Sequence, residues 1–322
     1  MKNSYAYAVA RIRALEVSLF SNGTIEQLIS IPDYESCLNF LEEKGWGGSE
    51  DEGSGEDILA TEESKIWQVV KELNIDMDNF EVLALPGRFH NLKAAIKESV
   101  TGKEGLNIYY ESGSPSGEEI KNIISQKDFA ALPDNMSKIA EEAYERMLHT
   151  GDGQLCDLLI DRACLNAVYR AGKDSGVDII KNYAESVVAV ADIKIAVRSH
   201  KTGKTIDFME AAMAPCHSLS VDRLAKAALA GEEAIIDYLD QTIYAEGGAA
   251  LAESSSAFER WCDNRIINTI KSEKYNAFTI GPVIAYVIAR QNEIKTVRII
   301  LSAKQSGLPE ESVRERVREM YV

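Results

Sequence analysis

The amino-acid sequence predicts an all-α protein, and three observations support this fold class. Apolar residues recur at helical spacing along most of the 322 residues, for example at Val9, Ile12 and Leu15. The β-branched residues fall inside these periodic stretches and not in short alternating runs between turns. Clusters of glycine, serine and proline separate the stretches. The segment 103–110 is the one place where a short strand is possible.

In the first half of the chain, apolar faces and boundary residues place the helices. Pro32 is expected at or near the first turn of a helix that carries Cys37, Leu38 and Leu41, because proline is tolerated there. The Pro86-Gly87 pair is expected to start or kink a long helical run. The other expected helices cover residues 6–20, 58–73, 80–100, 120–125, 135–148 and 155–171.

The second half continues in the same way. Gly281-Pro282 is expected to open the last long helix, and Pro309 starts a closing helix with Glu310 and Glu311 in its first turn, where the helix dipole favours acids. The remaining expected helices cover residues 178–198, 208–214, 221–230, 232–245, 257–272 and 281–303. The segment 45–55, with five glycines and an acidic run, is expected to be a mobile loop.

A triplet of polar residue, aliphatic residue and lysine recurs at a fixed interval. It reads Asn91-Leu92-Lys93, Asp192-Ile193-Lys194 and Glu293-Ile294-Lys295, and both steps are 101 residues. Thr101-Gly102-Lys103 returns as Thr202-Gly203-Lys204, again 101 residues on. This period is longer than the ~20–50 residues of common solenoid repeats and is close to the size of a small domain. The chain is therefore expected to hold three related helical-bundle modules: 1–114, 115–214 and 215–322.

The charge balance narrows the class of partner. The 51 acidic and 35 basic side chains give a net charge of −16, which argues against nucleic acid and against a broad anionic membrane surface. A partner with a basic face fits this charge, and so does plain solubility. No signal peptide and no membrane-spanning run is apparent. The five cysteines form no CxxC pair and are expected to be free thiols in a reducing compartment.

The motifs that resemble chemical sites are weak. Gly203-Lys204-Thr205 resembles part of a phosphate-binding loop, but Arg198 stands where that motif needs a glycine, so a helix C-cap is expected. Asp157 and Asp161 lie one helical turn apart and fit either acid–base work or a solvated face. The four histidines are far apart. We expect no catalytic residue, no cofactor and no metal.

The three repeated lysines, Lys93, Lys194 and Lys295, are the candidates for a partner-binding surface. Each lies in a helix dense in aliphatic residues, so each side chain either extends from a core-facing helix to solvent or lines a basic surface at three equivalent places. The arginines that would add to such a surface are Arg11, Arg13, Arg198 and Arg298.

Three segments, in order along the chain, resemble the C subunit of prokaryotic V/A-type rotary ATPases, the counterpart of the eukaryotic d subunit. They are the opening stretch 5–16, His90-Asn91-Leu92-Lys93-Ala94, and a C-terminal pattern of Pro282, Tyr286, Arg290, 293–295, 297–300 and 304–308. The resemblance covers nearly the whole chain. The glycine-rich acidic stretch 47–57 departs from the family pattern.

The resemblance implies a funnel of three modules in a pseudo-threefold arrangement, placed between the membrane proteolipid ring and the foot of the central shaft. It implies a rotor part without its own active site, peripheral on the cytoplasmic face of the membrane. Its partners would be the shaft subunits of D and F type and the proteolipid ring. Two alternatives stay open: a helical scaffold that binds soluble partners only, and an all-α hydrolase with clustered, perturbed acids.

Overall fold

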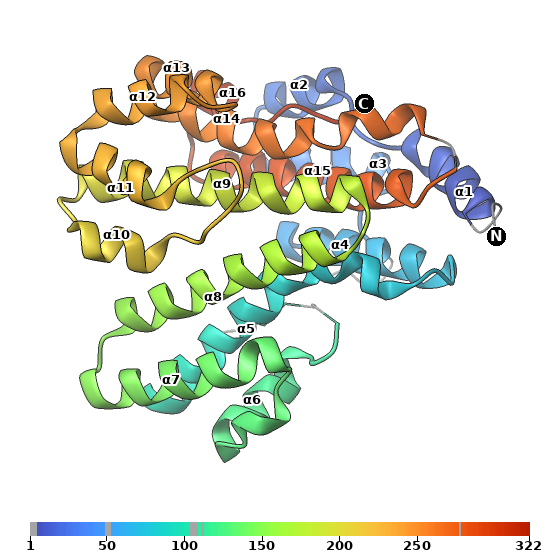
Figure 1. Cartoon of the computed structure of the whole chain (residues 1–322). Helices are drawn as coiled ribbons and strands as arrows, with labels where there is room; N and C mark the ends of the chain where they lie inside the picture. The colour runs from blue at the N-terminus through green and yellow to red at the C-terminus, as the bar shows by residue number, and fades with distance from the viewer. Residues whose placement is uncertain (1–4, 49–52, 104–108, 111–112, 277) are drawn as a thin grey trace. The chain divides into compact units, whose positions relative to one another are not determined.

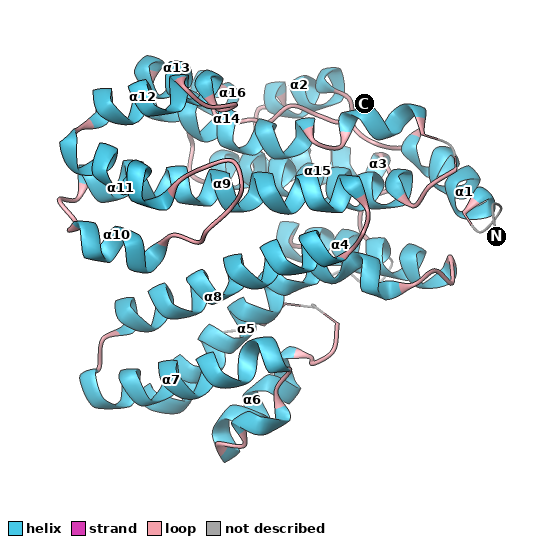
Figure 2. Ribbon diagram, viewed as in Figure 1, coloured by secondary structure: helices cyan, strands magenta, loops and turns pink. Residues whose placement is uncertain are grey.

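The computed structural model describes residues 5–48, 53–103, 109–110, 113–276 and 278–322. Among these residues every regular element is a helix, with sixteen α-helices, three short 3₁₀ helices and no strand (Figures 1 and 2). The all-α prediction is confirmed. Residues 104–108, which hold most of the possible strand, and residues 49–52 of the acidic loop lie outside the described residues.

The helices group into two compact units. The terminal unit combines Met1–Asp76 with Glu246–Val322, and the middle unit is Met77–Ala245. The expected modules 1–114, 115–214 and 215–322 rest on the repeat in the sequence, and the division into two units does not test them. The division into three modules therefore stays a prediction.

One long helix forms the core of the terminal unit. α15 (Gly281–Gln305) has 25 residues, and every residue from Gly281 to Arg290 is buried. A helix buried on all sides needs neighbours around its whole circumference. Within the unit it packs against six shorter α-helices, namely α1 (Ala6–Glu16), α2 (Asn22–Ser30), α3 (Tyr34–Glu43), α4 (Gly55–Glu72), α14 (Ser255–Asn268) and α16 (Glu310–Arg314). α13 (Ala245–Glu253) precedes α14, and the 3₁₀ helix η3 (Lys271–Tyr275) follows it.

The middle unit is built around α8 (Gly153–Asp174). This helix packs against α5 (Glu81–Thr101), α7 (Asp134–Thr150) and α9 (Asp178–Lys201). Shorter helices cover the outer faces: α6 (Gly117–Gln126) packs on α5, and α10 (Ile206–Ala212), α11 (Val221–Ala230) and α12 (Glu232–Asp240) pack on α9. Two 3₁₀ turns complete the unit, η1 (Met77–Phe80) and η2 (Phe129–Ala131).

Several helix boundaries differ from their expected positions, and two of the differences involve a capping side chain. Asp33 accepts a hydrogen bond from the Ser36 backbone N–H at 2.9 Å, so α3 begins at Tyr34 and Pro32 lies before it. Ser21 caps α2 by accepting from the Thr24 N–H at 3.2 Å, and this helix was not expected from the sequence. Pro86 lies inside α5 and does not start it.

The helix expected over 232–245 ends early, and a turn separates it from a further helix that was not expected. α12 ends at Asp240, and α13 begins at Ala245. In the turn, the Thr242 hydroxyl donates to the Leu239 carbonyl at 2.7 Å and accepts from the Tyr244 N–H at 3.1 Å. These local bonds compete with the helical pattern, because a hydroxyl offers the backbone another partner. Apolar periodicity alone does not report such a break.

The two glycines of the repeat end their helices in the left-handed conformation. Gly102 has a φ of 65° and Gly203 a φ of 63°, one position after α5 and two positions after α9. The Lys204 N–H closes the second turn by donating to the Ser199 carbonyl at 2.9 Å. The Gly-Lys-Thr motif is therefore a helix-ending turn, as expected, because glycine adopts this φ without a steric cost.

The contact between α8 and α9 depends on Gly172. A Cβ added there would lie 2.2 Å from the Ala184 Cβ and 3.3 Å from the Ile180 carbonyl oxygen. Gly172→Ala is expected to lower the free energy of unfolding by about 1–3 kcal/mol, because the two helices must separate to admit the methyl group. Urea denaturation followed by circular dichroism measures this.

Gly23→Ala is the matched control. Its added Cβ would have its nearest atom, Ser21 Oγ, at 3.6 Å, which is an ordinary contact. The control is expected to leave stability unchanged or slightly raised, because alanine favours helix. Equal losses in the two variants would contradict the close packing assigned to Gly172.

Candidate functional site

The three repeated triplets occupy equivalent places on three long helices, α5, α9 and α15. Their first members, Asn91, Asp192 and Glu293, are each 0% exposed to solvent. A buried polar group is costly unless it forms hydrogen bonds, so these positions need partners inside the protein. The repeat therefore marks a buried polar position as well as a lysine.

Each of the three buried side chains accepts a hydrogen bond from the backbone of a non-helical segment. The Tyr110 N–H donates to Asn91 Oδ1 at 2.8 Å, and the Ala214 N–H donates to Asp192 Oδ1 at 3.0 Å. The Phe20 N–H donates to Glu293 Oε1. Asn91 also donates to the Tyr110 carbonyl at 2.9 Å. In each case the buried side chain fixes an adjoining segment to its long helix. The bond to a backbone N–H is kept although the residue type differs.

Asp192 is the least satisfied of the three. Among the described residues, its Oδ2 is buried without a hydrogen-bond partner. Burial raises the pKa of this carboxyl from 3.8 to about 8, against the lowering effects of the Ala214 N–H and of Arg162. At neutral pH Asp192 is therefore held largely in its uncharged form. In this state it resembles the neutral Asn91 at the equivalent place on α5.

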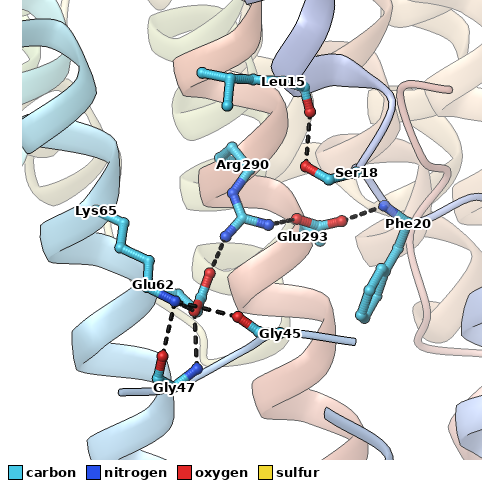
Figure 3. A network of polar contacts seen from close by, with 9 residues as sticks. All are labelled: Leu15, Ser18, Phe20, Gly45, Gly47, Glu62, Lys65, Arg290 and Glu293. Carbon is cyan, nitrogen blue, oxygen red and sulfur yellow. Dashed lines mark hydrogen bonds and ion pairs between the residues drawn. The ribbon is translucent and has the colours of Figure 1, made fainter. Parts of the chain in front are cut away.

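Glu293 belongs to a buried ion network in the terminal unit, drawn in Figure 3. Arg290 forms ion pairs with both Glu62 on α4 and Glu293, and the side chains of the three residues are 8%, 4% and 1% exposed. Burial raises the pKa of Glu293, while Arg290 and the Phe20 N–H act in the opposite direction. Charge-assisted bonds on both sides of one guanidinium are strong and directional.

Backbone and aromatic groups complete this network. Glu62 Oε1 accepts from the Gly47 N–H at 2.9 Å and pairs with Lys65 at 2.6 Å (Figure 3). Trp46 lies under the guanidinium of Arg290, with the ring centroid 5.1 Å away, and stacks on Phe20 at 5.0 Å. The network thus joins α4, α15, the segment after α1 and the segment after α3.

The burial of this network indicates whether its carboxylates have an acid–base role or a structural role. Two carboxylates converge, as in an acid–base site, but both are bound to Arg290 and are almost fully enclosed. A substrate could not reach them without unfolding the surrounding helices. Asp157 and Asp161 likewise pair with Lys97 at 2.6 Å and with Lys93 at 2.7 Å, across the contact of α8 with α5. Glu62 and Glu293 therefore hold helices together, whereas the pairs of Asp157 and Asp161 are surface contacts between α8 and α5.

The three repeated lysines have different surroundings. Lys93 is half-buried and pairs with Asp161 within the middle unit. Lys194 is half-buried on α9 and takes part in a polar or electrostatic contact. Lys295 is solvent-exposed on α15. The structure thus brings Lys93 and Lys194 into the middle unit and Lys295 into the terminal unit.

The four candidate arginines are also divided between the units. In the terminal unit, Arg11 pairs with Glu72, and Arg13 pairs with Glu16 at 2.6 Å and donates to the Glu273 carbonyl at 2.9 Å. Arg298 lies 3.5 Å from Glu56. In the middle unit, Arg198 is exposed on α9. Isolated surface ion pairs such as those of Arg11 and Arg298 each contribute about 0–1 kcal/mol to stability.

Lys295 and Arg298 lie together in a basic groove of the terminal unit, which we call the α15–α16 groove. It has a volume of about 540 Å³ and runs between the C-terminal half of α15, α16 and residues 316–318. Arg316 and Arg318 add two further cationic side chains to its lining. Sequence reasoning identified the first two residues and missed the last two, because nothing in the local pattern shows that the chain returns to α15.

The described residues contain no helix long and apolar enough to cross a membrane. Within the same residues no group of three or more histidine, cysteine or acidic side chains could hold a metal ion. Among the described residues, the five cysteines form no disulfide.

Comparison of the sequence with known protein families gives a match along nearly the whole chain. The family model described as ATP synthase (C/AC39) subunit matches residues 8–316. Because this match covers almost the whole chain, the chain belongs to that family. The resemblance drawn from the three sequence segments is confirmed.

Similar proteins from bacteria and archaea cover nearly the same length. The C subunit of the V-type sodium ATPase of Enterococcus hirae is 23% identical, over 96% of this chain and 97% of that protein. The C subunit of the V-type ATP synthase of Thermus thermophilus is 22% identical, over 98% and 99%. The C subunit of the A-type ATP synthase of Methanocaldococcus jannaschii is 22% identical, over 96% and 85%. The chain is therefore similar to these C subunits along nearly its whole length.

Removal of the central cation tests the buried network. Arg290→Met is expected to lower the free energy of unfolding by about 3–5 kcal/mol, because Glu293 loses its ion-pair partner and Glu62 keeps only the half-exposed Lys65. The loss in the free energy of unfolding should shrink as the pH falls, because protonation of the buried carboxylates removes their charge. Folding of the variant therefore takes up protons. Urea denaturation at several pH values measures both effects.

Lys65→Met is the control for this variant. Lys65 contacts the same Glu62, but its side chain is 41% exposed, so the loss should not exceed about 1 kcal/mol. A loss for Arg290→Met no larger than that of the control would contradict the central role of Arg290.

Asp192 should make stability depend on pH. With a folded-state pKa of about 8 against 3.8, the folded chain binds one more proton than the unfolded chain between these values. The stabilising contribution of Asp192 to the free energy of unfolding is therefore fully present below pH 3.8. It is lost as the pH rises to about 8, at up to about 1.4 kcal/mol per pH unit.

Asp192→Asn should remove this slope, because the amide keeps an acceptor for the Ala214 N–H and does not titrate. Denaturation midpoints between pH 5 and pH 8 would show the difference. Asp222→Asn, at an exposed side chain, is the control and should leave the slope unchanged. An unchanged slope in Asp192→Asn would refute the protonated, buried state.

Proposed function

We propose that this chain is a non-catalytic rotor subunit of a V/A-type ATP synthase or ion-pumping ATPase, which couples the central shaft to the membrane proteolipid ring. The observation that carries the proposal is the family match across residues 8–316. The relatives are named as subunits of a V-type sodium ATPase and of V-type and A-type ATP synthases. The coupled ion is therefore a proton or sodium.

The internal structure supports a mechanical role. A coupling subunit must transmit torque without bending, and interiors that are closely packed and fully bonded resist deformation. The Arg290 network ties four segments of the terminal unit together, and the equivalent position on α5 and α9 fixes further segments in the middle unit. The acids that could have served an active site are used in these contacts.

The proposed partners are the shaft subunits of D and F type and the proteolipid ring, at the cytoplasmic face of the membrane. The proposed contact surface keeps the seven basic residues: Arg11, Arg13, Lys93, Lys194, Arg198, Lys295 and Arg298. Exposed or half-exposed cations that form only weak internal pairs can exchange these for acids of a partner. The three-module arrangement around one axis is part of this proposal.

Isolation of the native complex tests the proposal against the alternative of a scaffold for soluble partners. The tagged chain, purified from detergent-solubilised membranes of its own cells, should bring down shaft subunits and proteolipid in constant ratio. A chain recovered only with soluble proteins would support the scaffold, and a chain recovered alone would oppose both.

Charge reversal tests the surface. Replacement of Lys93, Lys194 and Lys295 by Glu is expected to reduce recovery of the shaft and ring partners by at least about tenfold, because like charges across an interface repel. The unfolding midpoint of the variant should stay close to that of the wild type. Mass spectrometry of the purified complex gives the ratio.

The control replaces three exposed lysines outside the proposed surface, Lys71, Lys138 and Lys173, by Glu, which gives the same change in net charge. This control should keep its partners. Full recovery of partners with the first variant would leave the repeated lysines with a structural role only, and unfolding of that variant would show that they stabilise the helices.

A further inference from the structure

The α15–α16 groove combines a cationic lining with an apolar base. Among the described residues that line it, none is acidic and four are basic: Lys295, Arg298, Arg316 and Arg318. Between them lie Ile299, Ala303, Leu308 and Val313. On a chain with a net charge of −16, four cations around one apolar groove are a local reversal of the overall field.

Internal acids balance only part of this charge. Arg318 pairs with Asp263 at 2.7 Å, and Arg298 lies 3.5 Å from Glu56. Among the described residues, Lys295 and Arg316 form no ion pair, and Arg318 Nη1 is buried without a hydrogen-bond partner. Nitrogen donors that no internal acid matches therefore remain on both sides of the groove.

The surroundings of Lys295 agree with this imbalance. Lys295 is exposed to solvent, but the protein that forms the groove around it partly desolvates its ammonium group and lowers the pKa, as do the neighbouring Arg318 and Arg298. Asp263 and Glu63 act in the opposite direction, but neither forms an ion pair with Lys295 among the residues that the structure describes. An external carboxylate would relieve the repulsion between these cations.

The groove wall is held in place before any partner arrives. The Glu319 N–H donates to Asn264 Oδ1 at 2.9 Å, and Asn292 donates to the Glu319 carbonyl at 3.0 Å. These bonds fix the segment that carries Arg316 and Arg318 against α14 and α15. A preformed site loses less conformational entropy on binding than a mobile one.

The length of the groove selects the kind of ligand. Its lining on α15 extends from Lys295 to Ser306, which corresponds to about 16 Å along the helix axis. A single phosphate or lipid headgroup would contact one end only. An amphipathic polypeptide segment can place carboxylates on the cations and apolar side chains on the base over the whole length.

We propose that the α15–α16 groove is a docking site for an acidic amphipathic segment of a partner protein. Carboxylates of the segment pair with Lys295, Arg298 and Arg316, and its apolar side chains cover Ile299 and Leu308. The net charge of −16 does not forbid this, because interactions beyond about 8 Å are screened at physiological ionic strength. The proposal does not depend on the coupling role, since the groove belongs to the isolated chain.

Binding of a designed peptide to the full chain tests the proposal. The probe is a fluorescent peptide of about four helical turns, with leucine on one face and glutamate on the other. Fluorescence anisotropy should show saturable binding that weakens with salt. The same peptide with glutamine for glutamate should bind at least about tenfold more weakly, because the charge-assisted pairs are lost.

Double variants of the groove and a matched control locate the binding site. Lys295→Glu with Arg316→Glu should weaken the glutamate peptide at least about tenfold, and Lys295→Ala with Arg316→Ala serves if the first pair disturbs folding. Lys138→Glu with Lys173→Glu, in the middle unit, is the control and should bind as the wild type does. Circular dichroism and the unfolding midpoint verify that each variant is folded.

Three outcomes would overturn the proposal. One is equal binding of the glutamate peptide by the wild type and by a folded groove variant. Another is no measurable binding to the wild type at low salt. The third is displacement of the peptide by millimolar inorganic phosphate, or stronger binding to vesicles with anionic lipid than to the peptide, because either would identify a point-anion site.

Discussion

The terminal unit depends on one buried cation. Arg290 is placed between Glu62 and Glu293, over the face of Trp46, at a depth where an unpaired charge would be too costly to keep. Both carboxylates also accept backbone N–H groups, from Gly47 and Phe20. The segments after α1 and after α3 can therefore approach α15 in only one arrangement, because any other leaves a charge or an N–H unsatisfied.

The same constraint appears in a weaker form in the middle unit. At the place of Glu293, α5 carries Asn91 and α9 carries Asp192, and each accepts an N–H from an adjoining segment. The chemistry changes from an amide to an uncharged acid to a paired carboxylate, while the geometry is kept. The repeated position thus keeps a bond to a backbone N–H although the residue type differs.

For a subunit that is proposed to transmit torque, this distribution of polar groups has a consequence. In that proposal, rigidity comes from buried bonds on the long helices, and the proposed contact surface consists of cations near the protein surface. The α15–α16 groove adds a place where the surface charge is reversed from that of the chain as a whole.

Local signals along the chain suffice for the helical class, most of the helices, the equivalence of α5, α9 and α15, and the family, because apolar periodicity and ordered motifs can be recognised without the fold. They do not reveal the cap that starts α2, the break between α12 and α13, or the partners of the buried triplet positions. Glu62 and Arg290 are 228 residues apart, and Arg316 returns to α15 only through the folded tail. Such contacts depend on how distant segments pack, so which charges are buried and which are available to a partner follows from the tertiary structure alone.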